Sequence, residues 1–247
     1  MGETTQTSSF FKKLWHSITG KKKDQNQEIN VYFISGMCYN CTVFDKLSLP
    51  HGFKKTYIEW HIPREDESLN EYAKVMAETI DQTRPFILVG YSFGAVIIQE
   101  MNTFLSPIKS IIISSFKSVD EIPTLFRAAK RAKLVKRVPD RIYSSTEFIT
   151  HAFNRFVYNI PTDELSDVMV YTDPIYIKWA IKKITEWIPN GKIKHLYHIH
   201  GSADQIFPCV NIKNAFIIEN GDHLMVMKKA DMVSSILDGI LLMKERA

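Results

Sequence analysis

The chain has 247 residues, of which 45% are hydrophobic and 23% charged, and it carries a net charge of +4. This length allows one α/β domain with a sizeable core, and the composition is ordinary for a globular protein. No RNA- or DNA-binding motif accompanies the mild positive charge, so we expect no nucleic-acid partner. Three cysteines, a small and odd number, argue against a disulfide-built secreted fold and favour a reducing, cytoplasmic location.

Residues 1–28 are predicted to form a flexible tail. Aromatic and aliphatic side chains recur at helical spacing in residues 10–18, and three lysines follow at 21–23. We expect neither a secretory signal nor a transmembrane segment, because no continuous apolar stretch is long enough. Gln6 stands where a myristoylation signal needs Ser or Thr. This basic, amphipathic tail fits weak docking on an anionic membrane surface, and the alternatives are a helix packed on the folded domain or plain disorder.

Two short strands and a helix are predicted to open the folded part. Val31–Ile34 and Thr56–Trp60 are brief runs typical of strands. Between Ser68 and Gln82, apolar residues recur at helical spacing. Because Glu71 stands three residues after Ser68, we expect a capping box at the start of this helix.

Residues 90–94, with the sequence GYSFG, lie between a predicted strand at 85–89 and a predicted helix at 95–101. Strand, G-x-S-x-G and helix are the context of a nucleophile elbow, in which a tight turn exposes the serine hydroxyl at the edge of a sheet. Ser92 is therefore a candidate nucleophile. A role as helix N-cap is the alternative, but it leaves unexplained the two flanking glycines, Gly90 and Gly94.

The alternating pattern stops after a further strand at Ile108–Ser114. Residues 117–190 contain no convincing strand and are too long for a plain connection. They are predicted to form several helices, interrupted near Pro139, Pro161 and Pro174, with aromatic residues such as Phe126 in their core or lining a pocket. A run of basic side chains in this segment is either a solvated helix face or a patch for an anionic partner: Arg127, Lys130, Arg131, Lys133, Lys136 and Arg137.

Asp204 and His223 each follow a predicted strand in the last quarter of the chain. These strands are expected at 195–200 and 215–218. The alternation of strands and helices predicts a mostly parallel sheet with helices on both faces, and such sheets bind ligands at the carboxyl ends of their strands. We therefore expect Ser92, Asp204 and His223 to meet at one rim.

The order Ser92, Asp204, His223, with a His-Gly pair at 200–201 before the acid, resembles that of the α/β-hydrolase family. The resemblance runs from about residue 30 to the C-terminus. It implies a hydrolase core at 29–116 and 191–247, with residues 117–190 as the cap. The sequence pattern predicts a C-terminal helix from about Lys229 to Lys244 that covers the sheet. In such a triad, His223 would take the proton of Ser92, and Asp204 would orient the imidazole.

Other carboxylates and histidines are candidates for the triad acid or for a metal site. Asp120 follows the strand at 108–114 and is a rival for the triad acid, whereas Asp222 is expected to be a turn residue. His198 and His200 would share one face of a strand. No cysteine or carboxylate pattern completes a metal site with them, so we expect neither a metal nor a cofactor.

A serine hydrolase also needs backbone N–H donors for the oxyanion. The N–H of Phe93, directly after the nucleophile, is the first candidate. The second is expected in the loop after the first strand, where the family usually has His-Gly. This chain has Ser35 and Gly36 there, which makes the N–H of Met37 the second candidate.

Cys38 and Cys41 form a C-x-x-C motif in the same loop. One interpretation is a redox pair, since the motif follows a strand as in thioredoxin-like proteins. Zinc would need two more ligands, of which Cys209 supplies at most one. The alternative is a pair of small residues packed beside the loop.

These features predict a serine hydrolase that cleaves a carboxylic ester with a small or medium acyl group through an acyl-enzyme. The same three residues would serve a thioesterase or acyltransferase acting on a carrier-bound or lipid acyl group. A non-catalytic, ligand-binding member of the fold is a further alternative. The basic run in the cap favours weak contact with an anionic membrane surface or an acidic acyl carrier. We expect the protein in the cytoplasm, with peripheral membrane contact through the tail as the alternative.

Overall fold

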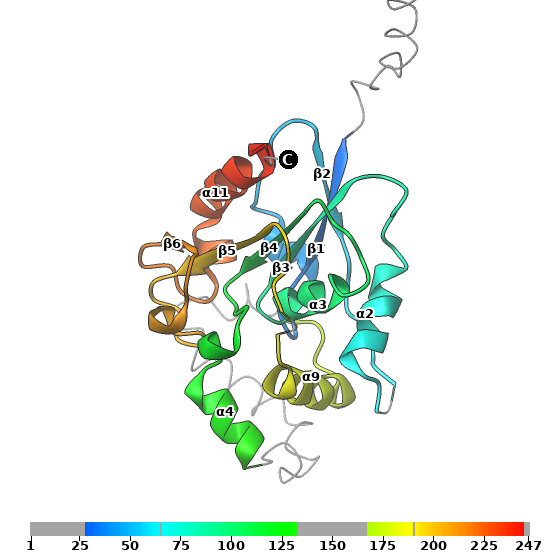
Figure 1. Ribbon diagram of the computed structural model, residues 1–247, viewed down its shortest axis with the longest axis vertical. Helices are drawn as coiled ribbons and strands as arrows, with labels where there is room; N and C mark the ends of the chain where they lie inside the picture. Colours follow the sequence, from blue (N-terminus) through cyan, green and yellow to red (C-terminus); the bar gives the residue numbers. More distant parts are fainter. Residues whose placement is uncertain (1–27, 65, 133–166, 190, 245–247) are drawn as a thin grey trace, which may run out of the picture.

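The computed structural model describes residues 28–64, 66–132, 167–189 and 191–244 (Figure 1). The predicted tail therefore lies almost wholly outside the described residues, and so does the middle of the predicted cap. Three residues of the basic run also lie outside them: Lys133, Lys136 and Arg137.

A six-stranded sheet forms the centre of the molecule, in the order β2-β1-β3-β4-β5-β6. Every pairing is parallel, which confirms the predicted sheet. Its strands are β1 (Ile29–Ile34), β2 (Phe53–Tyr57), β3 (Phe86–Tyr91), β4 (Lys109–Ile113), β5 (Leu196–Gly201) and β6 (Phe216–Ile218). Because the strands are parallel, the loops that follow β1, β3 and β5 leave the sheet at one edge.

Two hydrophobic cores cover the two faces of this sheet. Along β1, Val31 and Phe33 belong to one core, and Tyr32 and Ile34 to the other. This division follows from the alternation of side chains along a strand. The sheet is thus buried on both faces, as parallel sheets usually are.

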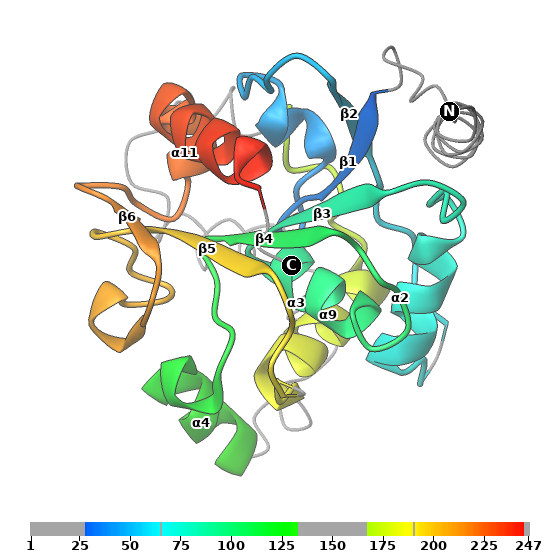
Figure 2. The ribbon, with the colours of Figure 1, turned by 45° about the horizontal axis from the view of Figure 1, so that its top comes forward.

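Helices confirm the prediction that both faces are covered. Figure 2 shows α11 (Ala230–Leu242) on one side of the sheet and α2 (Leu69–Ala77), α3 (Phe93–Met101) and α9 (Pro174–Glu186) on the other. The short elements η1 (Cys41–Phe44) and α10 (Met225–Lys228) pack on the side of α11. The remaining elements are η2 (Val119–Glu121), α4 (Thr124–Arg131) and η3 (Cys209–Asn211).

The capping box at Ser68 is confirmed, since its side chain accepts from the Glu71 N–H and Glu71 bonds back to the N–H of Ser68. The predicted end of this helix is wrong, because α2 stops at Ala77. The chain then turns at Asp81, whose N–H donates to the Tyr32 hydroxyl and whose carboxylate accepts from Thr83. Tertiary contacts therefore end the helix before its apolar pattern runs out.

Two other boundaries also differ from the prediction. The second strand, expected at 56–60, is β2 at Phe53–Tyr57, because its register with β1 pairs Ile29 with Phe53. Pro174 begins α9 rather than interrupting a helix, and the Asp173 side chain caps this end. Proline is well tolerated at the first position of a helix, where its missing N–H has no intrahelical partner.

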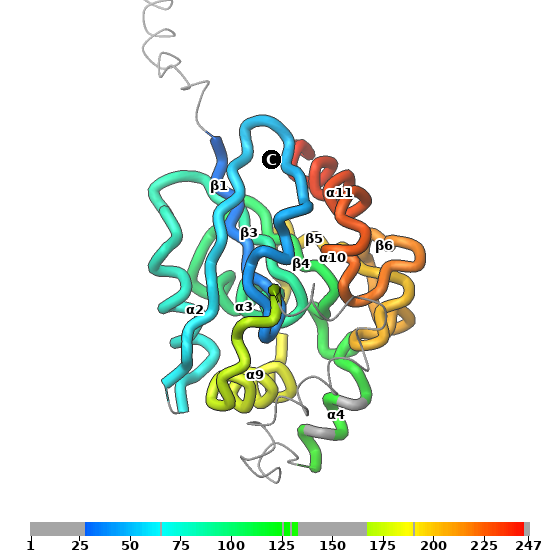
Figure 3. The backbone as a smooth tube through the Cα atoms, turned by 180° about the vertical axis from the view of Figure 1, so that it is seen from behind, coloured from blue at the N-terminus to red at the C-terminus, as the bar shows by residue number. Residues whose placement is uncertain are grey.

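The segment before α9 lies beside the loop that follows β1. Tyr39 and Met169 form an isolated antiparallel bridge, although the sequence indicated no strand in this part of the chain. Two more backbone bonds join the segments, from Asn40 N–H to Val168 O and from Tyr171 N–H to Cys38 O. Figure 3 shows this approach from behind, with the yellow-green trace rising to the blue loop. The extent of the cap as a separate unit at 117–190 stays a prediction.

Candidate active site

Ser92 occupies the sharp turn between β3 and α3. Its backbone angles, φ 52° and ψ −114°, are strained for a residue with a side chain. The Ser92 N–H donates to Ile113 O at 2.9 Å, and its carbonyl accepts from Ser115 Oγ at 2.9 Å. The hydroxyl makes no capping bond to α3, so the N-cap alternative does not account for it.

The two glycines around Ser92 allow backbones to approach closely. A Cβ on Gly90 would lie 2.5 Å from Gly94 O, inside the turn itself. A Cβ on Gly94 would lie 2.2 Å from Ile34 O and 2.4 Å from Ser35 O, at the end of β1. Larger residues would therefore separate the turn from the neighbouring strand.

His223 lies within hydrogen-bond distance of both Ser92 and Asp204. His223 Nε2 is 2.9 Å from Ser92 Oγ, and His223 Nδ1 is 2.9 Å from Asp204 Oδ2. A carboxylate oxygen only accepts, so Nδ1 carries the hydrogen and Nε2 is free to accept from the serine hydroxyl. This arrangement can remove a proton from the serine during attack on a carbonyl.

The acid is held in a closed loop after β5. Asp204 Oδ1 accepts from the N–H groups of Ile206 and Phe207, at 2.9 and 3.0 Å. On the other side of the loop, His200 Nε2 donates to Phe207 O at 2.8 Å. Burial alone would raise the pKa of Asp204, but the charge and hydrogen bond of His223, with His200 and the N–H of Phe207, hold it below its ordinary value. The carboxylate therefore stays ionised next to the imidazole.

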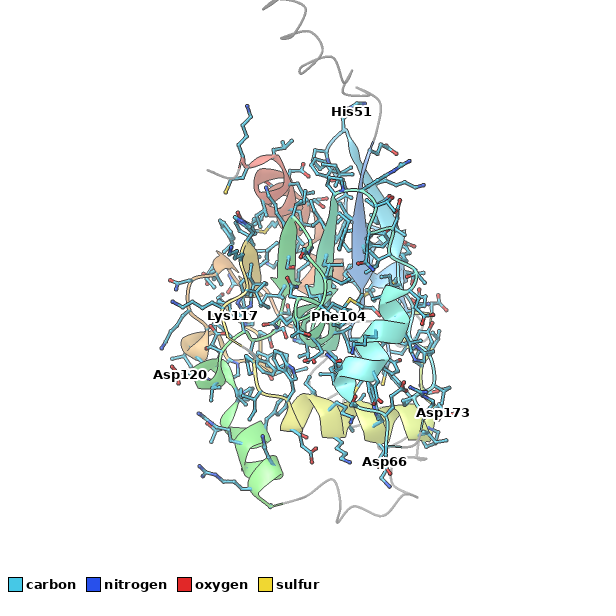
Figure 4. All side chains as sticks on the ribbon, turned by 45° about the vertical axis from the view of Figure 1, so that its right-hand side comes forward. His51, Asp66, Phe104, Lys117, Asp120 and Asp173 are labelled. Carbon is cyan, nitrogen blue, oxygen red and sulfur yellow. The ribbon has the colours of Figure 1, made fainter. Side chains whose placement is uncertain are left out.

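The rival candidates lie elsewhere. Asp120 lies in η2 at the surface (Figure 4). Its Oδ2 is 3.7 Å from Lys213 Nζ, so it is not the partner of His223. Asp222 accepts from the N–H of Leu224 and pairs with Lys228, as expected of a turn residue.

His198 and His200 do face the same side of β5, and their rings lie edge to face with centroids 5.1 Å apart. Lys117 Nζ is 3.0 Å from His198 Nδ1. Burial, followed by the Lys117 ammonium and His200, lowers the pKa of His198 well below its ordinary value. In the described ranges, no group of three or more His, Cys, Asp or Glu side chains is placed to hold a metal ion.

The loop after β1 carries the second candidate donor beside Ser92. A Cβ on Gly36 would lie 2.9 Å from a ring atom of Tyr91 and 3.2 Å from Ser92 Cβ, so glycine lets the loop approach the turn. Met37 and Ser92 line one cavity. Within the described ranges, the N–H groups of Met37 and Phe93 donate no backbone hydrogen bond to another residue, and their role as oxyanion donors stays a prediction.

Solved structures resemble this arrangement of strands and helices. MenH from S. aureus superposes with a TM-score of 0.67 at 14% identity, over 88% of this chain and 95% of its own. A hydrolase from Pseudomonas aeruginosa gives 0.66 at 11% identity, over 87% and 91%. A thermophilic esterase from Thermogutta terrifontis gives 0.64 at 13% identity, over 87% and 90%. The chain has the α/β-hydrolase fold. No protein-family model and no curated protein matches the sequence.

On this α/β-hydrolase fold, a cavity of about 140 Å³ opens beside Ser92 and His223. Phe126 of α4 and Ile184 of α9 line it, so both described helices of the predicted cap contribute to its wall. The rest of the lining is mostly apolar: Met37, Tyr39, Ile181, Thr185, Ile206 and Phe207. The Thr185 hydroxyl is already bonded to Ile181 O at 2.7 Å, so the wall presents few free polar groups.

The described part of the basic run lies on α4. Lys130 Nζ donates to Glu186 O at 2.9 Å and so joins α4 to the end of α9. Arg127 and Arg131 line a surface groove with Thr124, Ala128 and Ala132. Whether this face binds an anionic partner stays a prediction.

Cys38 and Cys41 are both fully buried, and their thiols are free. Burial raises the pKa of each thiol to about 12, which opposes the thiolate that redox exchange needs. The burial of both thiols and their raised pKa therefore favour two small packed residues over a redox pair. Cys38 also has φ 72°, a conformation that few residues with side chains adopt.

Trp60 is a site neighbour that the sequence did not single out. It follows β2, is buried, and its ring stacks on Phe93 with centroids 5.3 Å apart and 11° between planes. The replacement of the usual histidine by Ser35 was the available signal, because a buried hydroxyl in a loop requires a hydrogen-bond partner.

Among the described helices, none combines the length and apolar character needed to span a bilayer.

Proposed function

We propose that this protein is a serine hydrolase that cleaves a carboxylic ester through an acyl-enzyme, with Ser92 as nucleophile. The observation that carries the proposal is the pair of 2.9 Å contacts that His223 makes with Ser92 Oγ and Asp204 Oδ2. The serine contacts the histidine and the histidine contacts the aspartate, which is the arrangement of nucleophile, base and orienting acid that this chemistry requires.

In the first step, Ser92 Oγ forms a bond to the ester carbonyl carbon while His223 Nε2 takes the proton of the Ser92 hydroxyl. Negative charge builds on the carbonyl oxygen, where the N–H groups of Phe93 and Met37 would stabilise it. The leaving alcohol departs with the proton from His223, and the acyl group stays on Ser92. Water then loses a proton to His223, attacks the acyl carbon and releases the acid, and the serine regains its proton. Asp204 remains a carboxylate throughout and stabilises the imidazolium.

The cavity supports a small or medium acyl group. An apolar cavity of about 150 Å³ holds benzene in another protein, so the 140 Å³ here has room for an acyl chain of roughly six carbons. The apolar wall disfavours an acyl chain that carries a charged group, since burying an unpaired charge is costly. With p-nitrophenyl esters of increasing length, we expect kcat/KM to peak near four to six carbons, and a flat profile would contradict this assignment.

Labelling with a fluorophosphonate probe tests the reaction class. Wild-type protein should be labelled and Ser92→Ala should not, while Ser234→Ala serves as a control for loss of a hydroxyl in α11, where it donates to Ala230 O. The absence of labelling in wild type, while a reference hydrolase reacts, would exclude the serine hydrolase. Labelling that survives Ser92→Ala would place the nucleophile elsewhere. His223→Ala should lower the labelling rate by about three orders of magnitude or more.

A second candidate is a thioesterase or acyltransferase acting on an acyl group held by an acidic carrier. It is favoured by α4, where Phe126 lines the cavity while Arg127 and Arg131 face a groove on the surface. The charge-reversed variant Arg127→Glu/Arg131→Glu should then lower kcat/KM for carrier-bound substrate at low salt and leave small neutral esters unaffected. If the variant matches wild type on the carrier-bound substrate as well as on small neutral esters, the basic face has no role in substrate binding.

A further inference from the structure

The side chain of Trp60 holds the loop that carries Met37. Its indole Nε1 lies 2.9 Å from Ser35 Oγ and 3.1 Å from Gly36 O, and donates to both. The Ser35 hydroxyl in turn donates to Tyr39 O at 2.5 Å. Because Tyr39 N–H also donates to Gly36 O, the indole and the serine tie the two ends of this loop together.

The contact to Gly36 O sets the direction of the neighbouring N–H. Gly36 O and Met37 N–H belong to one peptide unit, which is trans, as are all the described peptide bonds. In a trans peptide, the C=O and N–H bonds point in opposite directions. With the carbonyl directed at the indole of Trp60, the N–H of Met37 points away from it, and that N–H makes no backbone hydrogen bond in the described part of the chain.

The same indole contacts the residue that carries the other candidate donor. Its ring stacks on Phe93, the first residue of α3, in a nearly parallel arrangement. Tyr176 of α9 packs against the indole from another direction, with ring centroids 5.6 Å apart. Trp60 itself is 4% exposed, so these contacts leave it little freedom to move.

We propose that Trp60 is a positioning residue of the oxyanion hole, which orients the Met37 N–H by its hydrogen bonds and supports the Phe93 N–H by stacking. This inference rests on the proposed serine hydrolase. Trp60 acts only through the two backbone donors, so its N–H matters for the charged transition state and little for binding of the neutral ester.

Trp60→Phe is the direct test, because phenylalanine keeps an aromatic ring and removes the N–H. Trp179→Phe is the matched control for the hydrogen bonds: that indole is also buried and packs edge to face on Phe93, with ring centroids 6.0 Å apart, but donates to a carbonyl outside the loop, Glu67 O, at 2.8 Å. Complete loss of one oxyanion donor costs about 10²–10³ in kcat, and a misdirected donor retains part of its effect. We therefore expect kcat to fall about 10- to 100-fold in Trp60→Phe with KM within about twofold of wild type, and both constants to be nearly unchanged in Trp179→Phe.

A trifluoromethyl ketone inhibitor gives a second measurement, because its adduct places an oxyanion in the same site. Its affinity should fall in Trp60→Phe by about the same factor as kcat. Ser35→Ala provides a variant that changes no tryptophan, and it should lower kcat less, since Gly36 O still accepts from the indole. The double variant should lose less than the product of the two single effects, because both act on one loop.

Equal kcat and inhibitor affinity in Trp60→Phe and Trp179→Phe, with wild type active, would overturn the positioning role alone. A rise in KM without a fall in kcat would also overturn it, since it would place Trp60 in ground-state binding. If Trp60→Phe does not fold, Ser35→Ala decides, and wild-type kcat in that variant would refute the inference. A wild type that neither hydrolyses esters nor reacts with fluorophosphonate would refute the proposed function itself.

Discussion

Ser92 holds a backbone conformation that glycine would adopt more easily, so replacing it should separate stability from activity. At φ 52° and ψ −114°, a residue with a Cβ is strained by about 1–3 kcal/mol. Ser92→Gly and Ser92→Ala both lose the hydroxyl and its contact with His223, so a comparison of the two variants cancels that loss. What differs between them is the strain at the Cβ and the freedom of the unfolded chain.

Relative to alanine, glycine at position 92 removes backbone strain of about 2 kcal/mol from the folded state. It also lowers the free energy of unfolding by about 0.5–1 kcal/mol, because the unfolded chain gains conformational freedom. We therefore expect Ser92→Gly to be more stable than Ser92→Ala by about 1 kcal/mol, or about 2–4 °C in Tm for a chain of this size. Neither variant should react with fluorophosphonate. The free energy of unfolding from urea titration, with equal m values, measures the difference.

Ser202 supplies the matched pair, because it is not among the described residues with positive φ. There, glycine should be less stable than alanine, since it gains no relief of strain and keeps its entropic cost. If Ser92→Gly is no more stable than Ser92→Ala, or if the difference matches that at Ser202, the turn does not store the strain inferred from its angles.

Three other changes test separate parts of the structure. In Gly94→Ala, the new Cβ would meet Ile34 O at 2.2 Å, so α3 must move away from β1; fluorophosphonate labelling should slow at least about 10-fold, and a wild-type rate would contradict this packing. Burial lowers the pKa of His198 and of His200, so the folded state keeps them neutral while the unfolded chain protonates them below about pH 6.5. The free energy of unfolding should therefore fall from pH 7 to pH 5, by up to about 1.4 kcal/mol per pH unit for each histidine, and a flat dependence in urea titrations would refute this. Iodoacetamide at pH 8 should modify Cys209 before the two buried cysteines of the C-x-x-C motif, whereas equal rates by mass spectrometry would show that those thiols are accessible.

Features of this fold that depend on neighbouring residues alone were predictable from the sequence. The strand before Ser92 was recognisable as a short apolar run between turn residues, and the structure places β3 at Phe86–Tyr91. The capping box at Ser68 was readable from two residues three positions apart. The chain order of the three candidate site residues was also visible, because each follows its own strand of a parallel sheet. Such signals need no knowledge of which segments meet in space.

The ends of helices and strands were harder to predict from the sequence, because tertiary contacts determine them. The strand β2 lies three residues earlier than expected, since pairing of Ile29 with Phe53 outweighs the apolar content of residues 58–60. Burial of Ile58 and Trp60 comes from packing after the strand has ended. The apolar residues at 56–60 therefore predicted burial correctly, but only part of this segment belongs to the strand.

The replacement at Ser35 shows how a departure from a family pattern can be understood once contacts are known. From the sequence, serine in place of histidine left the loop conformation open. In the structure, the Ser35 hydroxyl accepts from Trp60 and donates to Tyr39 O, so both of its hydrogen-bonding functions are used within the loop. Trp60 lies 25 positions further along the chain and reaches the loop only because β2 pairs with β1. A buried hydroxyl that replaces a larger side chain is thus better interpreted as one half of a pair, whose other half is a donor on an adjacent strand or in the loop that follows it.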